Sequence, residues 1–295
     1  MDRKAFFKAS SIALGLALAG GCERGPRVVV GSKNFGEQIL LAEIAAQQIE
    51  RKMHVVVERK LEMGGTMLAH EALLKGDIDF YPEYTGTALL SILHRGAESD
   101  PAQVLKAVRE GYAPWHLRWL DPLGFNNSFA IVVLQKDAAD RHVKTLSDAA
   151  GYAKGWKMGA GYEFVKRPDG LSGLVKTYGI KLQGRPQTMD LGLLYAAMDG
   201  NSVDMVVGNG TDGQLSNPQY EELTDDKHYF PPYQAAYVIR EETLAKFPKL
   251  EGVLQGLAGK LDDKTMRELN YQVEVLHRSG TKVAAEWLTK FDATN

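Results

Sequence analysis

The sequence contains a single cysteine, Cys22, among 295 residues, which excludes an internal disulfide and any metal site built from several cysteines. It has no excess of basic residues, because 35 Lys and Arg are matched by 37 Asp and Glu and no basic run exceeds two residues. A nucleic-acid partner is therefore not expected. No apolar run reaches the roughly 20 residues that a transmembrane helix needs, so the mature chain should have none.

The N-terminal residues are typical of an export signal. Arg3, Lys4 and Lys8 precede an uncharged stretch, 9–21, that is rich in Ala, Leu and Gly and ends in small residues directly before Cys22. Cys22 in this place resembles a lipoprotein processing site, and we expect it to be lipidated; the alternative is a secreted protein without a lipid. Because residues 2–8 also resemble a twin-arginine signal with lysine as the second basic residue, the export route stays open.

The rest of the chain has the composition of a folded protein, with 44% hydrophobic and 24% charged residues. Short β-branched runs alternate with helical patterns, which predicts an α/β architecture with largely parallel sheets in two lobes. The expected strands are 28–30, 55–57, 78–81, 129–134, 156–158, 203–207 and 235–239. The expected helices are 37–52, 64–74, 100–111, 171–178, 191–198, 241–247, 248–258, 263–276 and 281–291.

The loops after the predicted strands are the first place to look for function, since ligands in such folds bind at the carboxyl ends of strands. They are 32–34, 82–87 and 209–213. Patterns for catalysis are missing from the sequence. The seven histidines show no HxxxH spacing, and Gly170-Leu171-Ser172-Gly173 places its second glycine one residue too early for a nucleophile elbow.

Aromatic residues and single cations share the predicted loops. They are Lys33, Tyr84, Phe129, Arg167 and Tyr233. Aromatic faces attract a quaternary ammonium group, and a lysine or arginine can pair with a carboxylate, so one site could hold a zwitterion by both ends. The alternative is that the tyrosines beside prolines only pack at corners and that the arginine is exposed.

An ordered series of motifs resembles the osmoprotectant-binding proteins of ABC importers, which are extracytoplasmic receptors for glycine betaine, carnitine and choline. The motifs are Val30-Gly31-Ser32-Lys33-Asn34-Phe35, Gly76-Asp77-Ile78-Asp79, Tyr81-Pro82-Glu83-Tyr84-Thr85-Gly86-Thr87, Leu123-Gly124-Phe125-Asn126-Asn127, Phe164 with Arg167 and Asp169-Gly170, Thr211-Asp212-Gly213 and Phe230-Pro231-Pro232-Tyr233. The resemblance covers about Val28 to Asn270, and the Pro82–Thr87 motif is its most specific part.

This resemblance implies a type II periplasmic-binding-protein fold, in which two lobes joined by a two-stranded hinge close over a ligand. The implied organisation is an export signal and tether (1–26), lobe 1 (27–127 plus 236–295) and lobe 2 (128–235). It also implies that Lys33, Thr87 and Arg167 hold the ligand carboxylate.

The same resemblance makes Tyr84 and Tyr233 walls of an aromatic cage for the ligand's cation. Two cage positions depart from the family pattern. Phe129 keeps a ring without the hydroxyl, and Asn209 replaces a ring altogether.

The function expected from the resemblance is binding of a quaternary-amine zwitterion and its delivery to an ABC permease in the membrane. No cofactor, metal or catalytic residue is expected, and membrane contact should be through the lipid anchor alone. Two alternatives stay open: the same fold binding a bulkier betaine such as ergothioneine, and a secreted α/β enzyme. The missing ring at Asn209 favours a larger zwitterion over glycine betaine.

Overall fold

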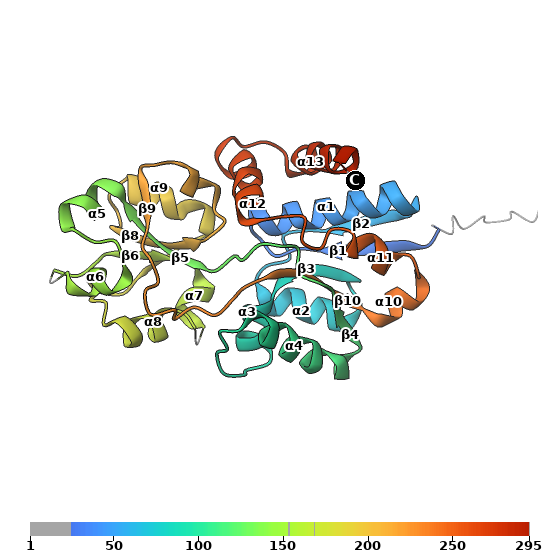
Figure 1. Cartoon of the computed structure of the whole chain (residues 1–295), viewed down its shortest axis with the longest axis horizontal. Coiled ribbons are helices and arrows are strands. Elements are labelled where there is room, and N and C mark those ends of the chain that lie inside the picture. Colours follow the sequence, from blue (N-terminus) through green and yellow to red (C-terminus); the bar gives the residue numbers. More distant parts are fainter. Residues whose placement is uncertain (1–24, 153, 168, 295) are drawn as a thin grey trace, which may run out of the picture.

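The computed structural model describes residues 25–152, 154–167 and 169–294, which form two five-stranded sheets covered by helices (Figure 1). The first sheet has the order β2-β1-β3-β10-β4, with β1 at Arg27–Gly31, β2 at Val56–Lys60, β3 at Phe80–Tyr84, β4 at Leu117–Trp119 and β10 at Ala235–Arg240. The second has the order β7-β6-β8-β5-β9, with β5 at Phe129–Leu134, β6 at Met158–Ala160, β7 at Gln187–Thr188, β8 at Met205–Asn209 and β9 at Tyr220–Glu222.

Helices cover both sheets. Those of the first lobe are α1 (Gly36–Met53), α2 (Thr66–Lys75), α3 (Thr85–Thr87), η1 (Ala88–Ile92), α4 (Pro101–Tyr112), η2 (Ala113–Trp115), α10 (Glu241–Lys246), α11 (Leu250–Gln255), α12 (Asp263–Asn270), η5 (Tyr271–Val275) and α13 (Gly280–Thr294). Those of the second lobe are α5 (Gln135–Arg141), α6 (Leu146–Gly151), α7 (Tyr162–Lys166), α8 (Leu171–Tyr178), η3 (Leu191–Leu193), α9 (Leu194–Asp199) and η4 (Gly213–Ser216). The α/β prediction is confirmed.

Both sheets are mixed, so the expectation of largely parallel sheets is only partly right. In the first sheet β1 pairs in parallel with β2 and β3, but β10 runs antiparallel between β3 and β4. In the second, β5 runs antiparallel to both of its neighbours. β5 and β10 are the strands that follow the two crossings between the lobes. Each starts at the hinge and runs antiparallel to the strands on both of its sides.

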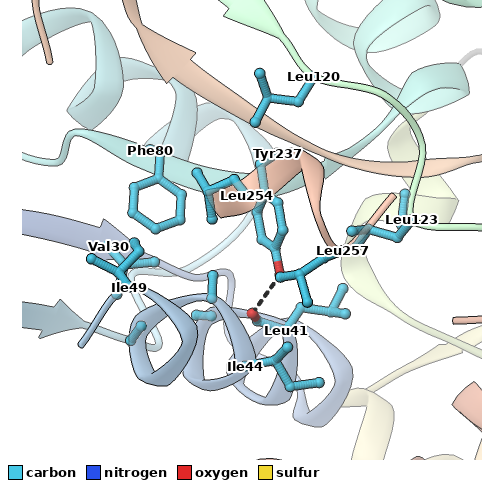
Figure 2. Close-up of a cluster of buried hydrophobic side chains, with 14 of the residues drawn as sticks. Val30, Leu41, Ile44, Ile49, Phe80, Leu120, Leu123, Tyr237, Leu254 and Leu257 are labelled. Atoms are coloured by element: carbon cyan, nitrogen blue, oxygen red, sulfur yellow. Dashed lines mark hydrogen bonds between the residues drawn. The ribbon is translucent and has the colours of Figure 1, made fainter. Parts of the chain in front are cut away.

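Each sheet has a hydrophobic core on both faces. Figure 2 shows the core between the first sheet and α1, where Val30 and Phe80 from the sheet face Leu41 and Ile44 from the helix. The Tyr237 hydroxyl in the same core donates a hydrogen bond to the Leu41 carbonyl at 2.9 Å. A buried polar atom is thus paired, as burial requires.

The chain crosses between the lobes twice, and the two crossings pair with each other (Figure 1). Asn126 forms an antiparallel bridge with Gln234, and the Asn127 N–H donates to the Tyr233 carbonyl at 3.0 Å. The Tyr233 N–H donates to Asn126 Oδ1 at 2.6 Å. The two-lobed fold with a two-stranded hinge is confirmed.

The prediction of a loop over 82–84 was wrong, because β3 continues to Tyr84 and a helical turn starts at Thr85. The helix expected over 263–276 is present, as an α-helix to Asn270 and then as a π-helical turn over Tyr271–Val275. No helix among the described residues is long and apolar enough to cross a membrane. The export signal and Cys22 lie outside the described residues.

Candidate ligand-binding cavity

A cavity of about 680 Å³ lies between the two sheets and is lined from both lobes. Residues after β1 and along β3 contribute the first-lobe wall, and residues of α7, β8 and the segment after it contribute the second-lobe wall. The structure brings all seven predicted ligand-binding residues to this one cavity: Lys33, Tyr84, Thr87, Phe129, Arg167, Asn209 and Tyr233. Its volume is within the range of small-molecule sites.

The aromatic residues form two groups in the wall. The ring of Tyr84 stacks with that of Phe35, with centroids 6.3 Å apart. The rings of Phe129 and Tyr233 meet edge to face, with centroids 5.7 Å apart. The protein's own cations approach these rings, since Lys33 Nζ lies 5.2 Å from the Tyr84 centroid and Arg167 Cζ lies 5.1 Å from that of Phe129. At these distances, both side-chain cations are attracted by the aromatic rings.

Lys33 is buried and already has a carboxylate partner. Its Nζ donates to Glu83 Oε1 at 2.5 Å and to Thr66 Oγ1 at 3.0 Å. Glu83 also accepts hydrogen bonds from the Tyr81 hydroxyl and the Tyr84 N–H. A buried ammonium requires this kind of pairing, because burial without a counter-charge is strongly unfavourable.

Arg167 is held in a similar way from the second lobe. Its Nε and Nη2 donate to the two oxygens of Asp169 at 2.9 and 2.5 Å, a two-pronged ion pair. Its Nη1 donates to Thr87 Oγ1 of the first lobe at 3.0 Å, and the Tyr233 hydroxyl donates to Asp169. Burial disfavours the charge, but the hydrogen bonds and charge of Asp169 outweigh burial and raise the pKa of Arg167.

Asn209, the last residue of β8, forms a side-chain hydrogen bond with another residue of the protein. Its Nδ2 donates to Asp212 Oδ1 at 3.2 Å, and its N–H donates to Asp212 Oδ2 at 2.9 Å. The Tyr195 hydroxyl also donates to Asp212 Oδ2, at 2.8 Å. Where the family pattern has a ring, this chain therefore has an amide that orients a carboxyl group.

The sequence reasoning missed the carboxyl groups in the cavity wall, which are those of Glu37, Glu62, Glu163, Asp190, Asp212 and Glu274. Glu37 accepts from the Tyr84 hydroxyl at 2.6 Å, the Thr211 hydroxyl at 2.5 Å, and the amides of Asn127 and Asn270, each at 2.8 Å. It thereby connects α1 to the segment after β8. Burial raises the pKa values of Glu37 and Asp212.

Glu274 lies on the π-helical turn η5, and its Oε2 accepts the Gly213 N–H at 3.0 Å. Burial, and then the nearby charge of Asp212, raise the pKa of Glu274 to about 9, so its carboxyl group holds a proton at neutral pH. Glu274 lies beyond the resemblance, and no sequence signal singled it out. Asp212 was within a quoted motif, and its acidic side chain was the available signal.

No group of three or more metal-ligating side chains comes together among the described residues. The cavity wall presents aromatic rings, ion pairs and hydrogen-bonding groups. It can surround a small molecule that has one cationic and one anionic end.

Comparison with known proteins gives a consistent result. The model of the OpuAC family, the substrate-binding domain of ABC-type glycine betaine transport systems, matches residues 26–290. The carnitine transport binding protein OpuCC of Listeria monocytogenes is 32% identical over 88% of this chain and 85% of its own length. The ergothioneine transport permease/ergothioneine binding protein EgtU of Helicobacter pylori is 35% identical over 89% of this chain, which spans 47% of that relative's length.

Solved structures agree. A glycine betaine/carnitine/choline ABC transporter structure has a TM-score of 0.76 at 29% identity, covering 91% of this chain and all of the other. Ligand-free YehZ of Escherichia coli has a TM-score of 0.66 at 30% identity, covering 90% and 98%. These relatives are substrate-binding proteins of transport systems. The chain belongs to the OpuAC family and is a substrate-binding protein of an ABC-type transport system.

Proposed function

We propose that this chain binds a quaternary-ammonium zwitterion in the cavity between its lobes, delivers it to an ABC permease and catalyses no reaction on it. The observation that carries the proposal is that the three rings and two cations predicted to bind the two ends of the ligand line one cavity. Tyr84, Phe129 and Tyr233 supply faces for the ammonium group. Lys33, Thr87 and Arg167 supply donors for the carboxylate.

The ion pairs within the protein leave donors for the ligand. An ammonium has three N–H groups, and Lys33 uses two of them on Glu83 and Thr66. A guanidinium has five, and Arg167 uses three of them on Asp169 and Thr87. Among the residues that the structure describes, one N–H of Lys33 and two of Arg167 have no partner, and they can donate to a ligand carboxylate.

The ligand that the site fits best is a betaine larger than glycine betaine, for example ergothioneine. A ring is missing at Asn209, and the space there is lined by hydrogen-bonding groups of Asn209 and Asp212. Loss of one ring weakens cation binding by about 0.5 to 2 kcal/mol, whereas the polar groups can bind a polar substituent. The choice is supported by the 35% identity to EgtU of Helicobacter pylori, an ergothioneine transport permease/ergothioneine binding protein.

Calorimetric titration with glycine betaine, carnitine, choline and ergothioneine tests the proposal. We expect ergothioneine to bind more tightly than glycine betaine, and Asn209→Tyr to reverse part of that difference. Tightest binding of glycine betaine, with no change in Asn209→Tyr, would contradict the choice of ligand while leaving the family assignment intact. Turnover of any of these compounds by the protein alone would support the enzyme alternative.

We also propose that the mature chain is anchored by a lipid on Cys22, with residues 1–26 serving as export signal and tether. Support comes from the sequence, in which Cys22 follows small residues at the end of an apolar stretch. Cys22→Ser should release the protein from membranes into the extracytoplasmic fraction. A wild-type protein that is wholly soluble in that fraction would contradict the anchor.

The lobe boundaries predicted from the sequence are retained as part of the proposal. β5 to β9 all lie between the paired crossings at Asn126-Asn127 and Tyr233-Gln234, which supports lobe 2 as 128–235. The other strands lie in 27–127 and 236–295, apart from Ala235 at the start of β10.

A further inference from the structure

The N-terminus of helix α2 is capped from the opposite lobe. Gly65 is the N-cap residue and has no side chain with which to accept a hydrogen bond from the first turn. Glu163 of α7, in the second lobe, takes this place: its Oε1 accepts the Thr66 N–H at 2.7 Å. Its Oε2 accepts the Thr66 hydroxyl at 3.2 Å. A carboxylate at a helix N-terminus satisfies an unpaired N–H and interacts favourably with the helix dipole.

The contact is so close that any side chain at the cap would displace the Glu163 carboxylate. A Cβ atom on Gly65 would lie 2.3 Å from Glu163 Oε1, and its three nearest heavy atoms would all belong to Glu163. The backbone itself does not require glycine, since Gly65 has φ −82°, which other residues adopt readily. Because Gly65 has no side chain, there is room at this cap for the Glu163 carboxylate, which reaches it from the other lobe.

The cap is connected to the ligand site through Thr66. The Thr66 Oγ1 that donates to Glu163 also accepts a hydrogen bond from Lys33 Nζ at 3.0 Å. Lys33 and Glu163 both line the cavity. A change in the position of Glu163 would thus alter how Thr66 and Lys33 are held.

We propose that Glu163 is a positioning residue of the receptor: it caps α2 across the cleft, favours the closed arrangement of the lobes, and holds Thr66 against Lys33. Opening the cleft separates α7 from α2 and returns the carboxylate and the first-turn N–H to water. The closed arrangement is then favoured by the stabilisation that one cap provides, which corresponds to about a two- to thirtyfold change in the ratio of closed to open molecules. The effect on lobe closure does not depend on the ligand, whereas the effect on binding rests on the proposed function.

The distance between lobes in the ligand-free protein is the direct test. Lys106 on α4 and Lys176 on α8 are exposed and lie on different lobes. In the full-length chain carrying Cys22→Ser, Lys106→Cys and Lys176→Cys give unique sites for spin labels. We expect Glu163→Ala to lower the closed-to-open ratio by about two- to thirtyfold, and Glu163→Gln, which keeps an acceptor oxygen but loses the charge, to lower it by less.

Glu71→Gln is the matched control, because it removes one carboxylate from the exposed face of the same helix, where Glu71 pairs with Lys75. It should leave the distance distribution unchanged. A Glu163→Ala distribution identical to that of the parent would overturn the proposal. So would an equal shift in Glu71→Gln, because the effect would then be one of net charge.

Gly65→Ala provides an independent arm. The new methyl group should displace the Glu163 carboxylate and shift the lobes towards the open arrangement, but it should have no further effect in a Glu163→Ala background. Equal effects of Gly65→Ala in both backgrounds would mean that the methyl group acts on α2 itself, and would overturn the steric part of the proposal. If Gly65→Ala fails to fold, the Glu163 variants still decide the question.

Ligand dissociation rates give the second readout. With any compound found to bind the parent, Glu163→Ala should accelerate dissociation by up to the same factor as the change in lobe closure. A changed lobe distance with an unchanged dissociation rate would retain the cap and overturn its connection to the ligand site. Absence of binding by every tested compound would count against the proposed function and leave the distance result valid.

Discussion

Arg167 illustrates how a charged side chain in the cavity wall is paired within the protein. Its guanidinium is bonded to Asp169 by two hydrogen bonds and to Thr87 by a third, so its charge is paired within the protein. Under the proposed function, a ligand carboxylate shares Arg167 with Asp169, and the arginine does not have to be ordered by the ligand.

Arg167→Ala should weaken binding of carboxylated ligands far more than binding of choline, which has no carboxylate. The loss expected for a charged hydrogen-bonding group is about 1.5 to 3 kcal/mol, or roughly ten- to a hundredfold in affinity. Calorimetry with carnitine and choline measures both. Because the substitution leaves Asp169 buried without its partner, Arg167→Ala with Asp169→Asn is the control. Equal losses for the two ligands would contradict a carboxylate-binding role.

Glu274 predicts a pH dependence of stability. Its pKa is raised to about 9 in the folded protein, above the ordinary value of 4.5, so the folded state holds a proton that the unfolded state releases. The stabilisation is complete below about pH 4.5 and is lost as pH rises to about 9, by at most about 1.4 kcal/mol per pH unit. Urea unfolding across that range should show this slope.

Glu274→Gln should reduce that slope, because glutamine does not titrate, while Glu37 and Asp212, whose pKa values burial also raises, still contribute a slope of the same sign. The exposed Glu71→Gln is a control that should leave it in place. Parallel stability curves for Glu274→Gln and the parent protein would show that the carboxyl group of Glu274 is already ionised at neutral pH.

Helix α4 illustrates an element whose start is determined locally. Asp100 accepts the N–H groups of Ala102 and Gln103 at 2.8 and 3.4 Å, and Pro101 occupies the first helical turn. Asp100→Ala should lower the free energy of unfolding by about 1 kcal/mol, whereas Asp100→Asn, which can still cap, should lower it by much less. Chemical denaturation measures both. Equal losses in the two variants would assign the effect to charge and not to capping.

Such local signals explain which elements could be predicted from the sequence. The Asp100-Pro101 start of α4 was predicted by its capping residues, and the left-handed Gly76 was predicted at the end of α2. The extension of β3 through Pro82 was missed, since proline is unfavourable in a central strand. β1 pairs with β3 only at Phe80, so β3 has β10 alone beside it at Pro82, and this depends on tertiary structure.

The cavity was predictable in part for the same reason. Five of its seven predicted residues belong to short motifs, Phe129 and Asn209 are the two positions that depart from the family pattern, and all seven line the cavity. The pairing of Lys33 with Glu83 and the meeting of Asp212 with Glu274 join segments that are far apart in the chain. Nothing in the residues around each member indicates the partner. Such contacts follow only from the way in which the two sheets and the C-terminal helices come together.

For the whole molecule, the separate cores of the two sheets predict how the ligand affects unfolding. Each lobe has its own buried clusters, whereas the cavity takes residues from both. A ligand that needs both folded lobes should raise the free energy of unfolding by about 2.7 kcal/mol at one hundred times Kd. Calorimetric scans should then show a single, sharper transition. A ligand that shifts only one of two resolved transitions would contradict binding between the lobes.

Tyr233 belongs at once to the hinge and to the aromatic wall. Its backbone is bonded to Asn126 and Asn127 of the other crossing, its ring meets Phe129, and its hydroxyl is bonded to Asp169. The hinge between the lobes thus includes a residue that also lines the cavity. Because Tyr233 contributes to both the cavity wall and the hinge, a substitution at Tyr233 that changes ligand preference also changes the mechanical compliance of the receptor.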